Sequence, residues 1–146
     1  MNLLEQARVF RETFGQESLL NISRYGFIKK SLWDMQTGLI KEEASELLNA
    51  ADELFADPEN EKRREEFVKE MCDLVFVVYQ LAATYNIDLD EAMNRVFESY
   101  MSKLDDDGKA IYREDGKILK GPNYVEPDFT DLYPVPYLYN YDTSSK

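Results

Sequence analysis

Residues 39 to 48 read Leu-Ile-Lys-Glu-Glu-Ala-Ser-Glu-Leu-Leu, and residues 70 to 78 read Glu-Met-Cys-Asp-Leu-Val-Phe-Val-Val. Both stretches lie in longer segments that are rich in apolar residues, and in the first these recur at three- and four-residue steps, the period of an α-helix with one buried face. Each stretch also carries two acidic residues three positions apart. This combination predicts two packed helices that turn carboxylates toward each other.

Outward from these stretches, helical segments account for most of the chain before residue 105. We expect four of them, at about Leu3–Phe14, Lys30–Ala56, Pro58–Tyr85 and Leu89–Leu104, with an irregular connection over residues 16–27. Gly15 ends the first helix, and Pro58 prevents continuation of the second. Asp88 and Glu91 have the spacing of a capping box at the start of the fourth. Short connections between long helices favour antiparallel neighbours, so the sequence predicts an all-α antiparallel bundle of about four helices.

The pattern changes after residue 105 to turns and a hairpin. Residues 105–108 and 121–124 have turn composition, and residues 110–113 with 117–120 are typical of a small hairpin. We therefore expect a C-terminal hairpin and loop extension on one domain, residues 1–128. Residues 129–146 form a Tyr- and Pro-rich tail with too few apolar side chains for a core of its own, which we expect to lie across its own domain or a neighbouring subunit.

Charge and composition exclude several classes of function. The 146 residues include 17 Lys and Arg against 29 Asp and Glu, giving a net charge of −12, and no histidine. Such an acidic chain is a poor binder of nucleic acid or of an anionic membrane surface. Without histidine, acid-base and metal chemistry must be carried out by carboxylates. The single cysteine, Cys72, is expected to be a small buried side chain, and the absence of disulfides and of a leader segment predicts a cytoplasmic protein.

The acidic pairs differ in their relation to the apolar faces. On the helical wheel of residues 30–56, Glu43 falls inside the apolar stripe, Glu46 near its edge and Glu42 outside it. Glu70 and Asp73 repeat the three-residue spacing, and Asp73 stands among apolar neighbours. A bare carboxylate on a buried helix face is costly and needs a partner.

The basic residue beside the second pair is Lys69, which we expect to point elsewhere on the wheel. Four carboxylates that meet without a basic partner repel one another unless a divalent cation neutralises them, and oxygen ligands select hard ions such as Mg²⁺ or Mn²⁺. Glutamate pairs at helical spacing are also common on solvated surfaces, so an ordinary acidic face is the alternative.

The arrangement Glu42-Glu43-x-x-Glu46 followed by Glu70-x-x-Asp73 resembles the signature of the MazG-like, all-α nucleoside triphosphate pyrophosphatases. The resemblance extends through Met101–Leu104 to residues 113–124, which read Arg-Glu-Asp-Gly-Lys-Ile-Leu-Lys-Gly-Pro-Asn-Tyr. It covers most of positions 6 to 128 and is similar to the short stand-alone form found in bacteria and in phages of cyanobacteria.

This resemblance implies a Mg²⁺-dependent enzyme that cleaves a (d)NTP to the (d)NMP and pyrophosphate, by attack of a metal-activated water on the α-phosphate, with Mn²⁺ as a substitute metal. It places the enzyme in the cytoplasm, the host cytoplasm if a phage encodes it. The metal ligands would be Glu43, Glu46, Glu70 and Asp73. Because the chain has no histidine, a carboxylate must accept the proton, and we prefer Glu46 over Glu42 for this role.

The resemblance also suggests residues that contact the nucleotide. For the phosphates these are Lys103, Arg113, Lys117 and Lys120, and for the base pocket Trp33, Gln36 and Tyr100. The chain departs from the family pattern at Tyr100, where an asparagine is common, at Gln36, where an arginine is common, and at Arg11, where a histidine is common. These departures affect base and sugar selectivity more than hydrolysis, and dGTP is the substrate that the resemblance to phage proteins favours.

Two alternatives stand beside this interpretation. The first is a related all-α enzyme that cleaves phosphoribosyl-ATP. The second is a non-catalytic helical interaction module whose acidic face merely binds a cation. The broadly apolar helices and the Tyr-rich tail predict burial by a second subunit in a homodimer or homotetramer, with no nucleic-acid or membrane partner.

Overall fold

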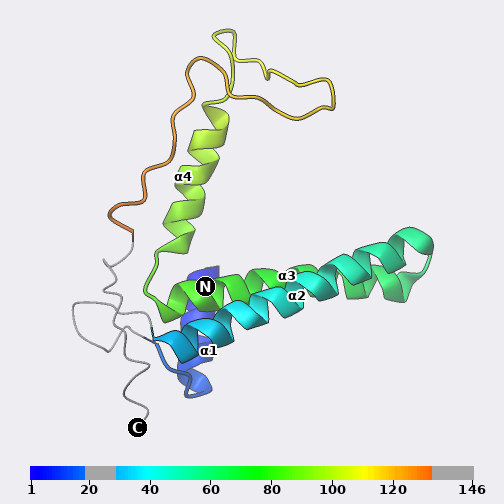
Figure 1. Ribbon diagram of the computed structural model, residues 1–146, viewed down its shortest axis with the longest axis vertical. Coiled ribbons are helices and arrows are strands. Elements are labelled where there is room, and N and C mark those ends of the chain that lie inside the picture. Colours follow the sequence, from blue (N-terminus) through cyan, green and yellow to red (C-terminus); the bar gives the residue numbers. More distant parts are fainter. Residues whose placement is uncertain (19–28, 133–146) are drawn as a thin grey trace. The chain divides into compact units, whose positions relative to one another are not determined.

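Figure 1 shows the computed structural model, which describes residues 1–18 and 29–132. Within these residues the fold contains four helices and no strand, so the all-α prediction is confirmed. The helices are α1 (Leu3–Thr13), α2 (Lys30–Ala56), α3 (Glu61–Thr84) and α4 (Leu89–Met101). Most of the predicted connection over residues 16–27 and most of the Tyr-rich tail lie outside the described residues.

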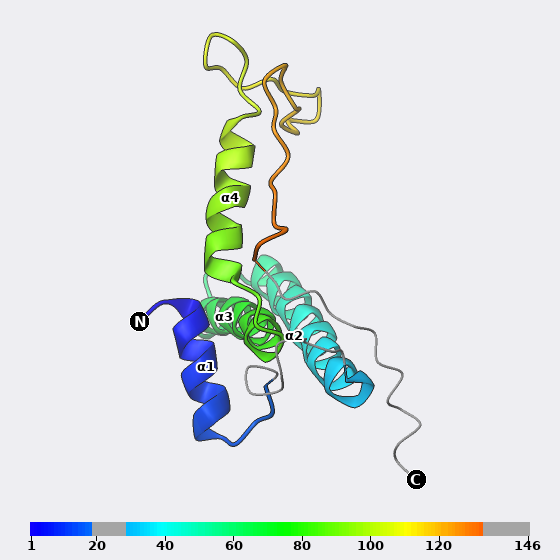
Figure 2. The ribbon, with the colours of Figure 1, turned by 90° about the vertical axis from the view of Figure 1, so that its left-hand side faces the viewer.

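The described part of the chain divides into two compact units, one within residues 1–87 and the other within residues 88–132. In the first unit, α2 and α3 run side by side as a helical hairpin, and α1 packs on α3 (Figures 1 and 2). Its buried apolar side chains include Leu4, Ala7, Leu32, Ala50, Val77, Ala82 and Ala83, and the polar side chains of Arg11, Gln36 and Thr84 are buried as well. The boundary predicted at residue 128 stays a prediction.

Side-chain caps set the ends of the first and third helices. The side chain of Asn2 accepts a hydrogen bond from the Glu5 backbone N–H at 2.8 Å, and the Glu5 carboxylate accepts one from the Asn2 N–H at 3.0 Å, which completes a capping box. Helix α3 begins at Glu61 and not at Pro58, because the Asn60 side chain caps the Arg63 N–H at 3.2 Å.

Helix α4 in the second unit is shorter than expected. It begins where the sequence predicts, with the Asp88 side chain accepting from the Glu91 N–H at 3.1 Å. It ends at Met101, three residues before the predicted end at Leu104, and the Ser102 hydroxyl there donates to the Ser99 carbonyl at 2.6 Å. Local side-chain bonds of this kind compete with helix continuation.

The predicted hairpin is present in reduced form. Tyr112 and Ile118 form a single antiparallel bridge, and the Arg113 N–H donates to the Lys117 carbonyl at 2.8 Å. The turn around Gly116 has a φ of 87°, which glycine adopts without strain. The pairing is thus confirmed, but it is too short to make a named strand.

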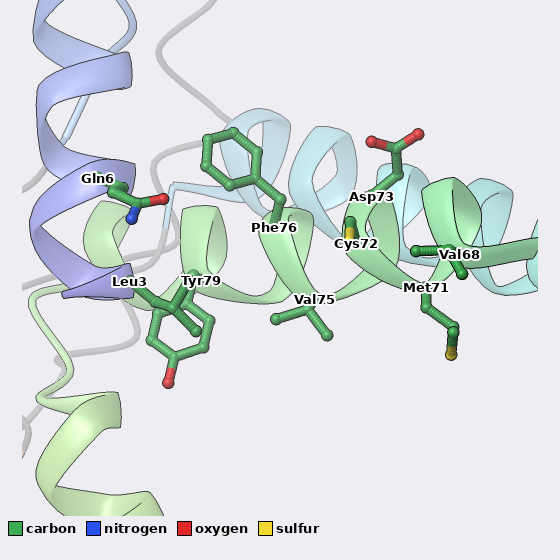
Figure 3. A pocket seen from close by; sticks show the side chains of 9 residues that line it. All are labelled: Leu3, Gln6, Val68, Met71, Cys72, Asp73, Val75, Phe76 and Tyr79. Atoms are coloured by element: carbon green, nitrogen blue, oxygen red, sulfur yellow. The ribbon is translucent and has the colours of Figure 1, made fainter. Parts of the chain in front are cut away.

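The apolar half of α3 is less buried than predicted. Val77 and Ala82 are buried, but Met71 and Val75 are 37% and 45% exposed, and Cys72 is exposed, so the prediction of a buried cysteine is wrong. The reason is that in this unit α1 and α2 cover two sides of α3 and leave a third open. A groove of about 510 Å³ lies along the α1–α3 junction; Figure 3 shows Met71 and Val75 projecting from one side of α3 and Asp73 from the other.

None of the described helices is both long and apolar enough to cross a membrane.

Candidate metal centre

The helical hairpin of the first unit brings together three of the four predicted metal ligands. Glu43 and Glu46 lie one turn apart on α2, and Glu70 lies on the adjacent α3. Each of the three offers a carboxylate oxygen within 4.8 Å of the others. Glu46 is exposed, Glu43 is half-buried and Glu70 is buried with only 7% of its surface exposed.

Two carboxylate oxygens in this cluster are buried without a hydrogen-bond partner. They are Oε2 of Glu43 and Oε2 of Glu70. A buried charged oxygen loses its water and gains nothing in return, so it is costly unless a ligand satisfies it. This is the feature that separates the cluster from the solvated glutamates elsewhere on the surface.

The burial of Glu43 and its acidic neighbours also change its pKa. Its pKa is raised above the usual glutamate value, chiefly by desolvation and then by the charges of Glu46, Asp73, Glu70 and Glu42. Like charges disfavour the ionised form, and a bound divalent cation would reverse that effect. The carboxylates of the cluster therefore repel one another, and a bound cation would lower this repulsion.

Lys69 corrects one expectation. Its ammonium donates to Oε1 of Glu70 at 2.9 Å and to Oδ2 of Asp73 at 2.6 Å, so it does not point away from the acidic pair. A lysine stem is long and flexible enough to fold over its own helix to the residue four positions on. These bonds raise the pKa of Lys69, the bond to Asp73 contributing most.

Asp73 lies outside the three-carboxylate cluster. Its side chain is 40% exposed and ion-paired to Lys69, although its charge still acts on Glu43. Glu42 is exposed and also influences Glu43 only through its charge. The ligand role of Asp73 and the proton-acceptor roles of Glu46 and Glu42 stay predictions.

The residues present fit a hard divalent cation. All donors are carboxylate oxygens, which suit Mg²⁺ or Mn²⁺ and not a soft metal. Two of the oxygens are buried and unpartnered, and the exposed Glu46 leaves one side open to water and substrate. The structure thus supports a cation site formed by Glu43, Glu46 and Glu70.

Two predicted base-pocket residues lie on α2 before the carboxylates. Gln36 precedes Glu43 by two helical turns and is 1% exposed, and its Oε1 has no hydrogen-bond partner. Trp33 is 36% exposed, and its ring packs edge-on against Tyr85 with centroids 5.4 Å apart. Gln36 therefore has a hydrogen-bond acceptor without a donor, whereas one part of the Trp33 ring already packs against Tyr85.

A buried polar group near the end of the hairpin was not predicted as part of the site. Arg11 is 1% exposed and donates to Gln80 Oε1 and to Gln16 Oε1, both at 3.2 Å, and to the Glu17 carbonyl. Burial lowers the pKa of Arg11, against the opposing effect of the Glu17 charge, and burial together with Glu17 raises the pKa of Tyr85 to about 12. The signal in the sequence was the position of Arg11, seven residues after the buried Leu4 and four after Ala7, on the core side of its helix.

The predicted phosphate contacts belong to the second unit, where several of them already have partners. The Lys103 ammonium lies 4.3 Å from the ring centroid of Tyr100, whose side chain is 58% exposed. Lys120 lies 4.5 Å from the Tyr124 ring and 3.9 Å from the Glu126 carboxylate. Cation–π contacts at exposed sites are weak, so both lysines can be recruited by a stronger anion.

Arg113 and Lys117 flank the turn of the short hairpin. Arg113 donates through Nε to Asp115 Oδ1 at 2.9 Å and through Nη2 to the other carboxylate oxygen, which lowers the pKa of Asp115. Lys117 is exposed and forms no ion pair within the described part of the chain. Of the two, Lys117 is the one whose charge is available.

A close backbone approach fixes the turn that carries Lys120. Gly121 donates its N–H to the Lys103 carbonyl at 2.9 Å, and a Cβ at Gly121 would lie 2.5 Å from that oxygen and 2.7 Å from the Leu104 oxygen. Ser99 adds a hydrogen bond from its hydroxyl to the Val125 carbonyl at 2.7 Å, and the Ser102 hydroxyl accepts from the Val125 N–H at 2.9 Å. Part of the motif over residues 99–124 therefore serves the local fold.

These features define an all-α protein with a carboxylate cluster built across a helical hairpin. Residues 10–100 match the family described as phosphoribosyl-ATP pyrophosphohydrolase, more than half of the chain, so the protein belongs to that family. It is accordingly a pyrophosphohydrolase of the all-α fold, a hydrolase that acts on acid anhydrides. The narrower resemblance to the short stand-alone MazG-like form stays a prediction. The comparison with curated proteins gave no match.

Proposed function

We propose that the protein is a Mg²⁺-dependent nucleotide pyrophosphohydrolase that converts a (d)NTP to the (d)NMP and pyrophosphate. The observation that supports this most is the cluster of Glu43, Glu46 and Glu70, whose buried oxygens lack partners. Membership of a pyrophosphohydrolase family makes the polyphosphate chain of a nucleotide the natural ligand of a cation held there.

The cluster suggests how the residues divide the work. A bound divalent cation neutralises phosphate charge and lowers the pKa of a nearby water. Glu43 and Glu70, the less exposed members, would hold the cation in place. The exposed Glu46 is free to accept the proton of the attacking water. The water oxygen bonds to the α-phosphorus, and the bond from that phosphorus to the bridging oxygen breaks, releasing pyrophosphate. Our candidates for binding the phosphates are Lys103, Lys117 and Lys120. Arg113 joins them only if its ion pair with Asp115 breaks.

For the base, we propose Gln36, Trp33 and Tyr100, with Gln36 as the residue that reads hydrogen bonds. Its buried Oε1 lacks a donor, and a site built to bond a polar group rejects analogues that lack it. Every nucleobase carries an N–H donor that suits this acceptor, and dGTP as the favoured substrate rests on the resemblance to phage proteins. Phosphoribosyl-ATP is the second candidate, and the family match over residues 10–100 favours it.

A pyrophosphate-release screen tests the proposal directly. All (d)NTPs and phosphoribosyl-ATP are offered to the protein with Mg²⁺ and with Mn²⁺, with Glu46→Gln as the blank. Turnover of dNTPs without turnover of phosphoribosyl-ATP is the expected result, and the reverse would assign the second substrate. Glu65→Gln, the same change at an exposed α3 position outside the cluster, should leave turnover unchanged.

The same screen separates the enzyme from a non-catalytic cation-binding module. A module would release no pyrophosphate from any nucleotide, while Glu43→Gln and Asp73→Asn would change stability or assembly. Loss of turnover in these variants with an intact fold would support the enzyme.

We also propose that the protein is a homodimer or homotetramer in which a second copy covers the open face of α3. The groove there is lined by apolar side chains including Leu3, Val68, Met71 and Val75, and its one charged lining residue is Asp73 (Figure 3). Two copies of such a face would bury mainly apolar side chains against each other in a self-complementary, two-fold interface. A monomer in light scattering would contradict this proposal.

A further inference from the structure

Lys69 occupies an unusual position among the carboxylates of the first unit. Its single ammonium bonds two residues of its own helix, Glu70 through Oε1 at 2.9 Å and Asp73 through Oδ2 at 2.6 Å. Glu70 is 93% buried by its surface, and its second oxygen has no partner although it belongs to the three-carboxylate cluster. The lysine therefore neutralises one side of a group whose other side is still unsatisfied.

The ammonium of Lys69 is open to solvent. Its side chain is 63% exposed and that of Asp73 is 40% exposed, so water can replace the carboxylates around the ammonium when it moves away. A lysine ammonium is also a point charge that swings about a flexible stem, unlike the rigid fork of an arginine. Figure 3 shows Asp73 projecting from the side of α3 opposite Met71 and Val75, away from the apolar part of the groove.

We propose that Lys69 is a built-in, displaceable cation that competes with the divalent metal for Glu70 and Asp73. This inference rests on the proposed function, because it takes the carboxylates as the metal site. In the metal-free protein Lys69 offsets part of the negative charge of Glu70 and Asp73 on its own helix. When a divalent cation binds, the ammonium leaves Glu70 and Asp73, which frees their oxygens as ligands.

Metal binding by charge-neutral variants is the first test. Mn²⁺ is titrated into the wild type, Lys69→Met and Lys62→Met, with the bound metal followed by calorimetry and electron paramagnetic resonance. Lys62 is the matched control, since it lies two turns earlier on α3, about 10 Å away, and forms no ion pair within the described residues. We expect Lys69→Met to bind Mn²⁺ about tenfold more tightly and Lys62→Met to change affinity less than about twofold.

Lysine footprinting tests displacement on the wild-type protein and needs no variant. The protein is treated with an acetylating reagent, with and without Mn²⁺, and each lysine is quantified by mass spectrometry. Acetylation of Lys69 should rise several-fold with Mn²⁺, while Lys62 and Lys41 stay constant. Higher affinity of Lys69→Met without this rise would indicate static repulsion and would overturn displacement.

The outcomes separate the inference from the proposed function. If Mn²⁺ binds and Glu70→Gln abolishes binding, but Lys69→Met has unchanged or weaker affinity, the inference fails and the metal site stands. If no variant and not even the wild type binds Mn²⁺, both fail. Lys69→Arg, which keeps the charge, should restore affinity toward the wild-type value if competition is the mechanism.

Discussion

The two units of the molecule differ in how their carboxylates are arranged. In the first unit the hairpin of α2 and α3 holds three carboxylates within 4.8 Å and leaves two buried oxygens without partners. In the described part of the second unit no such carboxylate cluster is found, and both arginines form ion pairs. Arg95 pairs with Asp131 and Glu91, and Arg113 pairs with Asp115.

This difference indicates which charged residues serve the candidate site and which stabilise the local fold. A protein that simply needed a stable hairpin would not gather like charges on its packed side, because their repulsion opposes folding. Matched pairs and side-chain bonds to the backbone, by contrast, hold a segment that has one helix and little apolar core. The buried carboxylate oxygens without partners mark the candidate site, and the paired arginines belong to the local fold of the second unit.

The largest expected effect comes from removing one unmatched charge. Glu43→Gln should reduce pyrophosphate release at least about a hundredfold, because a bound cation contributes several kcal/mol to phosphoryl chemistry. The melting temperature in metal-free buffer should stay equal or rise, because the substitution relieves the repulsion that raises the pKa of Glu43. Turnover and thermal unfolding are measured on the same sample.

Glu65→Gln, an exposed change of identical chemistry on α3, serves as the control and should alter neither quantity. A Glu43→Gln protein with full turnover and a lower melting temperature would contradict this prediction, because it would show that Glu43 stabilises the fold and does not serve the reaction.

A smaller effect is expected where the second unit depends on close backbone packing. Gly121→Ala should destabilise the unit by about 2 kcal/mol, because the new Cβ would lie 2.5 Å from the Lys103 oxygen. Gly38→Ala is the matched control on α2, where a Cβ meets nothing within 4 Å, and should stabilise by about 0.5–1 kcal/mol through helix propensity. Denaturant unfolding measures the stability of both variants, and hydrogen exchange of the Gly121 and Tyr124 amides measures the local effect of Gly121→Ala. A neutral Gly121→Ala would show that the turn is looser than the geometry indicates.

The smallest effect concerns the matched charges under acid. The pKa of Asp131 is lowered below its ordinary value of 3.8, chiefly by the Arg95 hydrogen bonds at 2.6 and 3.0 Å. A depressed folded-state pKa contributes stability above 3.8 that is lost as the pH falls through the folded value. Carboxyl NMR should show Asp131 titrating below 3.8 in the wild type and near 3.8 in Arg95→Met. A pKa of wild-type Asp131 at or above 3.8 would show that the Arg95–Asp131 pair does not stabilise the folded state.

Much of the fold followed from local chemistry. The end of α1 before Gly15, the end of α2 before Pro58 and the start of α4 at Asp88 depend on caps and breakers that act within a few residues, so they were predictable. The errors arose where a nearby polar side chain intervened, as Asn60 does at the start of α3 and Ser102 at the end of α4. The exposure of Cys72 was missed because an apolar run does not say how many neighbours it has.

The amino-acid sequence by itself determined the helices, the acidic pairs and the face of each helix on which they fall, since these depend on helical period and composition. Only the tertiary structure decided which carboxylates meet, which oxygens are left without a partner, and that Lys69 folds back onto Glu70 and Asp73. The physical reason is that the α2–α3 register sets these distances, and the conformation of a flexible lysine depends on charges that its own sequence position does not reveal.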